Sequence, residues 1–209
     1  MIIAGILMAT LCAFIFKNMN IKKVLLVLDV YFLLSEIFKQ VLLFYVNGYI
    51  DLWYFPFQLC SLSLYLIPLY LFTGKKFFLD FMSDFSLLGG FFAFFDTSGM
   101  QYGLSILTIN SYLWHFLLIY LGIFLKIKEK ESDFKKEIFL YLATILIATL
   151  INISFKSANM FYISPYHNMN QVIFMDIGLI IGQNKTKFFY CFMQLFGAYL
   201  INTLCKSFH

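Results

Sequence analysis

Three side chains with the chemistry of a covalent catalyst lie within long apolar stretches of this sequence. Cys60 occurs in "YFPFQLCSLSLYL", His115 in "SYLWHFLLIYL" and Glu36 in "LLSEIFKQ". A thiol becomes a strong nucleophile when a neighbouring base takes its proton, and histidine is the usual base. A carboxylate can orient that histidine. These residue types indicate a nucleophile at Cys60, a base at His115 and an orienting carboxylate at Glu36, provided that the fold brings them together.

Further polar residues are expected at a similar depth in the membrane. Amide and cationic side chains can hold a polar substrate group or stabilise a tetrahedral oxyanion. Polar groups that gather at one depth in lipid generally mark a functional site. We expect a substrate-binding set made up of Gln58, Lys39, Asn152, Asn159 and His167, with Asp96 facing the same pocket.

A purely structural explanation stays open for each of these residues. A lone buried cysteine packs as a small hydrophobic group. Glu36 and Lys39 are three residues apart and would form an ion pair along one helix face, and asparagines can join membrane helices through hydrogen bonds. Two further acidic residues are expected to pair with a basic turn at the membrane interface, namely Asp80 and Asp84 with Lys75 or Lys76.

The composition excludes a soluble domain. Of the 209 residues, 62% are hydrophobic and 12% are charged, whereas the exterior of a soluble protein must face water. A membrane helix needs about 20 apolar residues, and the chain contains several runs of this kind. We predict an all-α fold, a polytopic transmembrane helical bundle, in a single integral membrane domain that covers residues 1–209.

Polar breaks between the apolar runs define the expected membrane helices. Seven spans are predicted, with an eight-span arrangement as the alternative, at Ile2–Phe16, Val24–Val46, Tyr54–Phe72, Phe77–Phe95, Gly103–Leu125, Ile138–Phe155 and Phe188–Leu204. The apolar segment at residues 168–183 is shorter than a span and contains Asp176. We expect an interfacial or re-entrant helix there.

Lysine residues predict the orientation of the bundle. Cytoplasmic connections carry an excess of lysine, and here lysines concentrate after the first, third and fifth predicted spans. The N-terminus is therefore expected outside the cell, and the charged loop at residues 126–137 in the cytoplasm. Lys156, Lys185 and Lys187 lie on the opposite side in this arrangement, which keeps the eight-span alternative open.

The charge and the cysteines limit the ligands that we expect. The net charge is +4, and we attribute it to the cytoplasmic loops rather than to nucleic-acid binding. Cys12, Cys60, Cys191 and Cys205 lack the CxxC spacing of a metal or disulfide site. We expect membrane lipids as partners, with no nucleic acid, no metal and no cofactor, and the sequence leaves the oligomeric state open.

Four segments together resemble YwaF-type bacterial integral membrane proteins. "FPFQLCSLSLYLIPLYLFTGKK" is similar to a helix of that family that reads Leu-Pro-Leu-His-Leu-Cys-Asp before an apolar run and a basic turn. "LLSEIFKQ", "SYLWHFLLIYLGIFL" and "INISFKSANMFYISP" resemble its acidic, histidine-containing and asparagine-containing segments, in the same order. The chain departs from the family at Gln58 and Ser61, where histidine and aspartate are usual.

The animal relatives of that family are transmembrane acyltransferases that remodel ether phospholipids without a coenzyme A donor. The resemblance implies a membrane-embedded transacylase in a bacterial plasma membrane, with an acyl-enzyme on Cys60 and His115 as acid and base. Gln58 would then be a neutral substitute for a histidine. Two alternatives stay open: a transporter that binds ions or protons through Asp29, Glu36 and His115, and a non-catalytic seven-helix scaffold.

Labelling at position 130 tests the predicted orientation. A cysteine placed at position 130 should resist a membrane-impermeant thiol reagent in intact cells, because the lysine distribution puts this loop in the cytoplasm. A cysteine at the N-terminus should react and serves as the positive control. Labelling of position 130 would reverse the orientation.

Overall fold

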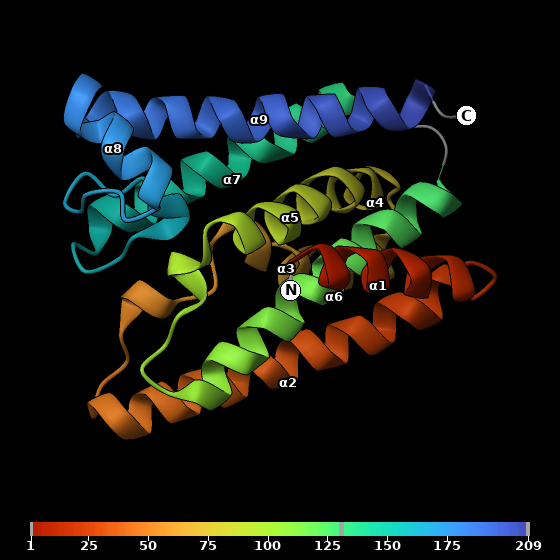
Figure 1. Cartoon of the computed structure of the whole chain (residues 1–209), viewed down its shortest axis with the longest axis horizontal. Coiled ribbons are helices and arrows are strands. Elements are labelled where there is room, and N and C mark those ends of the chain that lie inside the picture. The colour runs from red at the N-terminus through yellow and green to blue at the C-terminus, as the bar shows by residue number, and fades with distance from the viewer. Residues whose placement is uncertain (1, 130–131, 208–209) are drawn as a thin grey trace.

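The computed structural model describes residues 2–129 and 132–207. Every regular element in these residues is helical (Figure 1). Lys130, the position chosen for the orientation test, lies outside the described residues. The elements run in the order α1 Ile2–Ile15, α2 Ile21–Asn47, η1 Leu52–Tyr54, η2 Leu59–Ser61, α3 Ser63–Thr73, α4 Phe77–Phe81, η3 Met82–Ser86, α5 Leu87–Phe95, η4 Thr97–Met100, α6 Ser105–Lys128, α7 Phe134–Ser154, η5 Met160–Tyr162, α8 Val172–Ile181 and α9 Gln183–Ser207.

The helices confirm an all-α polytopic membrane protein. In the described part of the chain, four helices are long and apolar enough to cross a membrane, at Phe77–Phe95, Ser105–Lys128, Phe134–Ser154 and Gln183–Cys205. Shorter apolar helices cover Gly5–Ile15, Leu59–Thr73 and Val172–Ile181. Helix α2 has 27 residues and carries several charged side chains. The count of seven spans and the external N-terminus stay predictions.

The third predicted span, Tyr54–Phe72, is not one continuous helix. Its first part consists of the short turns η1 and η2, and the α-helix begins only at Ser63. Pro56 provides the physical reason, because proline has no N–H and forces the residue before it out of the helical region. Phe55 is accordingly extended, with φ −62° and ψ 137°. Cys60 therefore lies in a turn at the start of the helix rather than within it.

The middle of the molecule is formed by α4, η3 and α5, which lie between two groups of helices (Figure 1). Helices α7 and α9 pack on one side of this segment, and α6 packs on the other side with α1 and α2 behind it. The helices that pack directly on both sides of this segment, α6, α7 and α9, thus all follow it in the sequence.

Small residues allow α5 and α6 to approach closely. A Cβ atom at Gly90 would lie 2.9 Å from the backbone oxygen of His115 and 3.0 Å from the backbone nitrogen of Ile119. On the facing helix, a Cβ atom at Gly122 would lie 2.6 Å from Leu87 Cβ. Glycine at these positions therefore fixes the spacing between α5 and the helix that carries His115.

A buried charge cluster ties the same segment to its neighbours. η3 is a π-helical turn that contains Asp84, and Asp84 Oδ1 lies 2.6 Å from Lys126 Nζ of α6. Asn202 Nδ2 of α9 donates to Asp84 Oδ2 at 2.8 Å. The expected pairing with the basic turn holds for Asp80, whose Oδ1 lies 3.7 Å from Lys76 Nζ. Asp84 instead pairs across the bundle, because η3 directs it away from that turn.

Adjacent glycines of α5 allow a matched test of this packing. Alanine at Gly90 should lower the thermal unfolding temperature in detergent, because the added methyl overlaps rigid backbone atoms and overpacking costs about 1–3 kcal/mol. Alanine at Gly89 is the control, since its Cβ would lie 3.5 Å from Cys60 Cα, an ordinary contact. Alanine generally favours a helix over glycine by about 1 kcal/mol, so Gly89→Ala should not destabilise. Equal melting temperatures for the two variants would refute the close contact.

Candidate functional site

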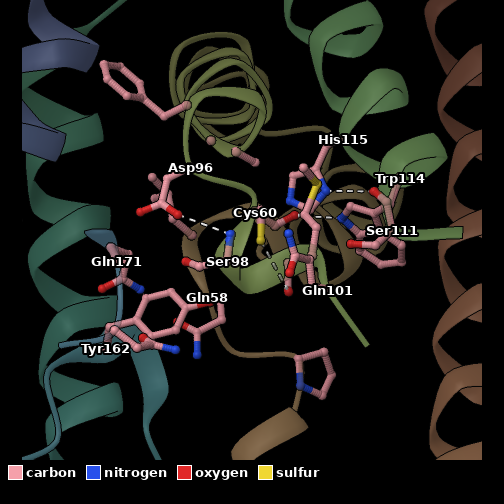
Figure 2. Close-up of a pocket in the computed structure, with 18 of the residues that line it drawn as sticks. Gln58, Cys60, Asp96, Ser98, Gln101, Ser111, Trp114, His115, Tyr162 and Gln171 are labelled. Carbon is pink, nitrogen blue, oxygen red and sulfur yellow. Dashed lines mark hydrogen bonds between the residues drawn. The ribbon is translucent and has the colours of Figure 1, made fainter. Parts of the chain in front are cut away.

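One cavity of about 630 Å³ contains most of the residues singled out by the sequence (Figure 2). Its walls are formed by α2, the turns before α3, α5, η4, α6, and the chain from Tyr162 through α8 to α9. The sequence-predicted residues that line it are Glu36, Lys39, Gln58, Cys60, Asp96 and His115. Residues separated by up to 79 positions in the sequence therefore face one space.

The turn η2 holds Cys60 at the wall of the cavity. Its backbone oxygen accepts a hydrogen bond from Trp114 Nε1 at 3.0 Å, so the turn is fixed to α6 one residue before His115. The thiol is half-buried, and Sγ lies 4.0 Å from the hydroxyl oxygen of Ser61. The backbone of Cys60 packs against Gly89 of α5, where an added Cβ would make an ordinary contact at 3.5 Å. The sulfur thus occupies a defined position, and no ion pair of the described residues includes it.

The ring of His115 has a defined protonation pattern. The side chain is buried, with 6% of its surface exposed, and Nδ1 lies 2.7 Å from the backbone oxygen of Ser111. A carbonyl oxygen only accepts hydrogen bonds, so Nδ1 carries the proton and Nε2 is the basic nitrogen. Among the described residues, no hydrogen bond joins a ring nitrogen of His115 to Cys60 Sγ.

Glu36 is held by its own helix rather than by His115. Its Oε2 lies 2.8 Å from Lys39 Nζ, and its Oε1 accepts from Gln40 Nε2 at 2.7 Å. Gln40 also donates to the backbone oxygen of Tyr54 at 3.0 Å. The carboxylate therefore links α2 to the turns that precede Cys60. The Ser111 carbonyl occupies the place at His115 Nδ1 where the sequence predicted an orienting carboxylate.

The two asparagines of the predicted set shape the cavity from behind. Asn152 is fully buried and bonds both backbone groups of Met160: its Nδ2 donates to the oxygen at 2.9 Å, and its Oδ1 accepts from the nitrogen at 2.7 Å. Asn159 accepts from the backbone nitrogen of Ser164 at 3.2 Å. Its own backbone oxygen accepts from Gln58 Nε2 at 2.8 Å. Both asparagines lie outside the cavity lining and hold the chain that borders it.

That chain contains a strained turn. Phe161 and Tyr162 have φ values of 53° and 57°, a left-handed conformation that residues other than glycine adopt rarely. Phe161 is fully buried, and its backbone nitrogen donates to Phe57 at 3.3 Å. The turn directs Tyr162 to the cavity (Figure 2). Hydrogen bonds from Asn152 to Met160 and from Ser164 to Asn159 hold the chain on either side of this turn.

His167 lies apart from the cavity. Its Nε2 is 2.8 Å from the backbone oxygen of Lys156, and its ring meets Trp53 edge-on, with ring centres 5.0 Å apart. These contacts close the loop between α7 and α8. His167 does not line the cavity, and its substrate-binding role remains a prediction.

The chain has a detectable family. A family model described as the TMEM164 family matches residues 1–201. The chain belongs to this family. No curated protein and no solved structure gave a match.

In this member of the TMEM164 family, several cavity residues come from connections that sequence reasoning did not single out. They are Ser98, Tyr102, Tyr162, Asn170 and Gln171. Burial raises the pKa of the Tyr102 and Tyr162 phenols, so both stay protonated and can donate a hydrogen bond. No signal in the sequence separated them from ordinary loop residues, because they carry no motif spacing.

Among the described residues, no group of three or more His, Cys, Asp or Glu side chains is placed to hold a metal ion.

The contacts of Glu36 lead to a test of its role. Glu36→Gln should lower the thermal unfolding temperature, because it removes the charge that balances the half-buried Lys39. The rate of any reaction that depends on His115 should change less than about threefold in the remaining folded protein, since no hydrogen bond joins Glu36 to His115 among the described residues. Gln40→Leu serves as a control that breaks the same link to Tyr54 without altering charge. A loss of turnover with unchanged stability would instead assign Glu36 to the chemistry.

Proposed function

We propose that this TMEM164-family protein is a membrane-embedded transacylase that moves acyl chains between phospholipids through a thioester on Cys60. The observation that carries the proposal is that Cys60 and His115 line one cavity, with His115 Nδ1 bonded to a carbonyl oxygen and Nε2 left as the base. The resemblance of the surrounding segments to YwaF-type proteins, whose animal relatives remodel ether phospholipids, supports the same activity. We place the protein in a bacterial plasma membrane.

The first half-reaction forms the acyl-enzyme. Nε2 of His115 accepts the thiol proton while Cys60 Sγ attacks the ester carbonyl carbon of a donor phospholipid. The tetrahedral oxyanion then collapses and breaks the bond from the carbonyl carbon to the glycerol oxygen. His115 returns the proton to that oxygen, so a lysophospholipid leaves and the acyl group remains on sulfur. The ring thus ends the step in its starting protonation state.

The second half-reaction transfers the acyl group to another lipid. His115 takes the proton of a free hydroxyl on an acceptor lysophospholipid, and the hydroxyl oxygen attacks the thioester carbon. Sulfur leaves and recovers the proton from His115. No further reactant is needed, because one ester is broken and one is formed.

Hydrogen-bond donors at the cavity can stabilise the oxyanion. The Gln58 amide nitrogen is already committed to the backbone oxygen of Asn159, which leaves its oxygen, an acceptor, free. The phenols of Tyr102 and Tyr162 line the same cavity and stay protonated. We assign oxyanion stabilisation to the tyrosine hydroxyls, and we assign to Gln58 the role of offering its free acceptor oxygen.

The shape of the cavity suits an amphiphile. Several of its lining residues are apolar and also exposed on the outer face of the helices, which defines a lipid-facing rim: Phe92, Phe95, Ile173, Phe189 and Met193. In a bilayer this rim contacts hydrocarbon, so an acyl chain can enter sideways while its ester reaches Cys60. The transporter alternative has less geometric support, because Asp29 is not part of the lining that contains Glu36 and His115.

Purified protein in liposomes tests the proposal directly. With a labelled phospholipid donor and a lysophospholipid acceptor, the wild type should transfer label through a hydroxylamine-sensitive intermediate on Cys60. Cys60→Ser should lose most transfer, because a serine hydroxyl is far less ionised than a thiol. His115→Gln should lose about 10²–10⁴-fold, the usual cost of removing a general base. The double variant should be little worse than the more severe single variant, since the two residues act as a unit.

Cys12→Ser is the matched control for this experiment. Cys12 is half-buried in α1 and lies outside the cavity lining, so its replacement should leave transfer unchanged. Wild-type transfer by Cys60→Ser would overturn the covalent mechanism. It would favour direct attack of the acceptor lipid on the donor ester, with His115 as the only base.

A further inference from the structure

Four buried polar atoms at the cavity have no hydrogen-bond partner in the described residues. They are Gln58 Oε1, Ser98 Oγ, Asn170 Oδ1 and Gln171 Oε1, and the residues that carry them all line the cavity. Buried polar atoms in folded proteins nearly always have a partner, because an unpaired one retains the full cost of its desolvation. We call these four residues the acceptor cluster. Three of the four atoms are amide oxygens, which only accept.

The acceptor cluster is assembled from three separate connections. Asp96 joins two of them, because its Oδ1 accepts from the backbone nitrogen of Ser98 at 3.1 Å and its Oδ2 accepts from that of Val172 at 2.8 Å. Gln171 and Tyr162 lie near each other at the wall of the cavity. In Figure 2, Gln58, Ser98 and Gln171 lie on one side of Cys60, and His115 lies on the other. The cluster is therefore a polar end of the cavity, distinct from the base.

The charges at the cavity favour a cationic ligand. Glu36 is balanced by Lys39 at 2.8 Å. Asp96, by contrast, accepts only from backbone N–H groups, and no ion pair of the described residues includes it. One negative charge is thus uncompensated at the polar end. A group that combines N–H donors with a positive charge would satisfy both the free acceptors and this carboxylate.

We propose that the acceptor cluster, together with Asp96, binds the N–H-donating cationic headgroup of a phospholipid. This inference rests on the proposed function, which identifies the ligand as a membrane lipid. The headgroup occupies the polar end, the acyl chain leaves through the lipid-facing rim, and the ester between them faces Cys60. Gln58, which stands where related proteins have histidine, contributes an acceptor to this site.

A headgroup methylation series tests donor recognition. Purified full-length protein in detergent is titrated with phosphatidylethanolamine and with its mono-, di- and trimethylated forms, all with the same acyl chains. Lipid retained in native mass spectrometry measures binding. The positive charge is constant along the series while N–H donors are lost one by one. The apparent Kd should weaken stepwise, by about tenfold between the primary ammonium and the trimethylated form, as expected for losing hydrogen bonds to a charged group.

Variants of two cluster residues locate the site. Ser98→Ala and Asn170→Leu should flatten the series to within about twofold, since a lost acceptor removes the preference for a donor. Neither side chain donates or accepts a hydrogen bond in the described structure, so neither change should lower the unfolding temperature of lipid-free protein. Asn168→Leu is the matched control, because Asn168 is exposed and lies outside this cavity. It should retain the full series.

The outcomes separate this inference from the proposed transacylase activity. Equal binding of all four headgroups by the wild type, or an unaltered series in both cluster variants, would overturn it. Tighter binding of lysolipids with no effect of methylation would assign the cluster to the acceptor hydroxyl and also overturn it. If liposome transfer fails for the wild type while the methylation series persists, the transacylase proposal fails and the headgroup site stands.

Discussion

The close approach of α5 and α6 is the constraint on which the cavity depends. The backbone of α5 at Gly90 lies so near His115 and Ile119 that no side chain fits between them. The next residue back along α5, Gly89, packs against the backbone of Cys60. Gly90 thus sets the distance from α5 to the helix that carries the imidazole, while the preceding residue of α5, Gly89, contacts the turn that carries the thiol. Trp114 fixes the third side of this arrangement through the Cys60 carbonyl.

Hydrogen bonds to backbone groups, rather than ion pairs, position the groups proposed for chemistry. His115 is oriented by a carbonyl of its own helix, and the turn at Tyr162 is held by asparagine amides. Such contacts suit a membrane interior, where an unpaired backbone group is costly and a charged partner requires compensation. Two ion pairs, Glu36 with Lys39 at the cavity and Asp84 with Lys126 where α6 meets η3, include neither Cys60 nor His115.

The cavity combines satisfied polar groups that shape it with unsatisfied ones that face it. Asn152 uses both its nitrogen and its oxygen on Met160, whereas Gln58 uses only its nitrogen and leaves its oxygen without a partner in the described residues. Free acceptors next to an uncompensated carboxylate reduce the stability of the empty protein and are expected where a ligand supplies the missing donors. The cavity thus joins a polar end to an apolar rim, and the proposed phospholipid ligand likewise joins a polar headgroup to apolar acyl chains.

The sequence by itself determined that this is a helical membrane protein, because apolar runs long enough to span a bilayer are stable in its hydrocarbon interior as helices. Residue type alone also singled out Cys60, His115 and Glu36 as candidates, and all three line the cavity, although Glu36 does not bond to His115. The sequence did not predict that the helix is interrupted at Pro56, so that Cys60 lies in a turn. It also did not predict that Asp84 pairs with Lys126 rather than with the nearby basic turn. Tertiary structure decided that Ser111 holds His115 and that the loop residues Ser98, Asn170 and Gln171 meet at one end of the cavity. The bond from His115 to Ser111 is local to α6, but the three loop residues come from separate segments, and nothing in their local sequence records that the folded bundle brings them together.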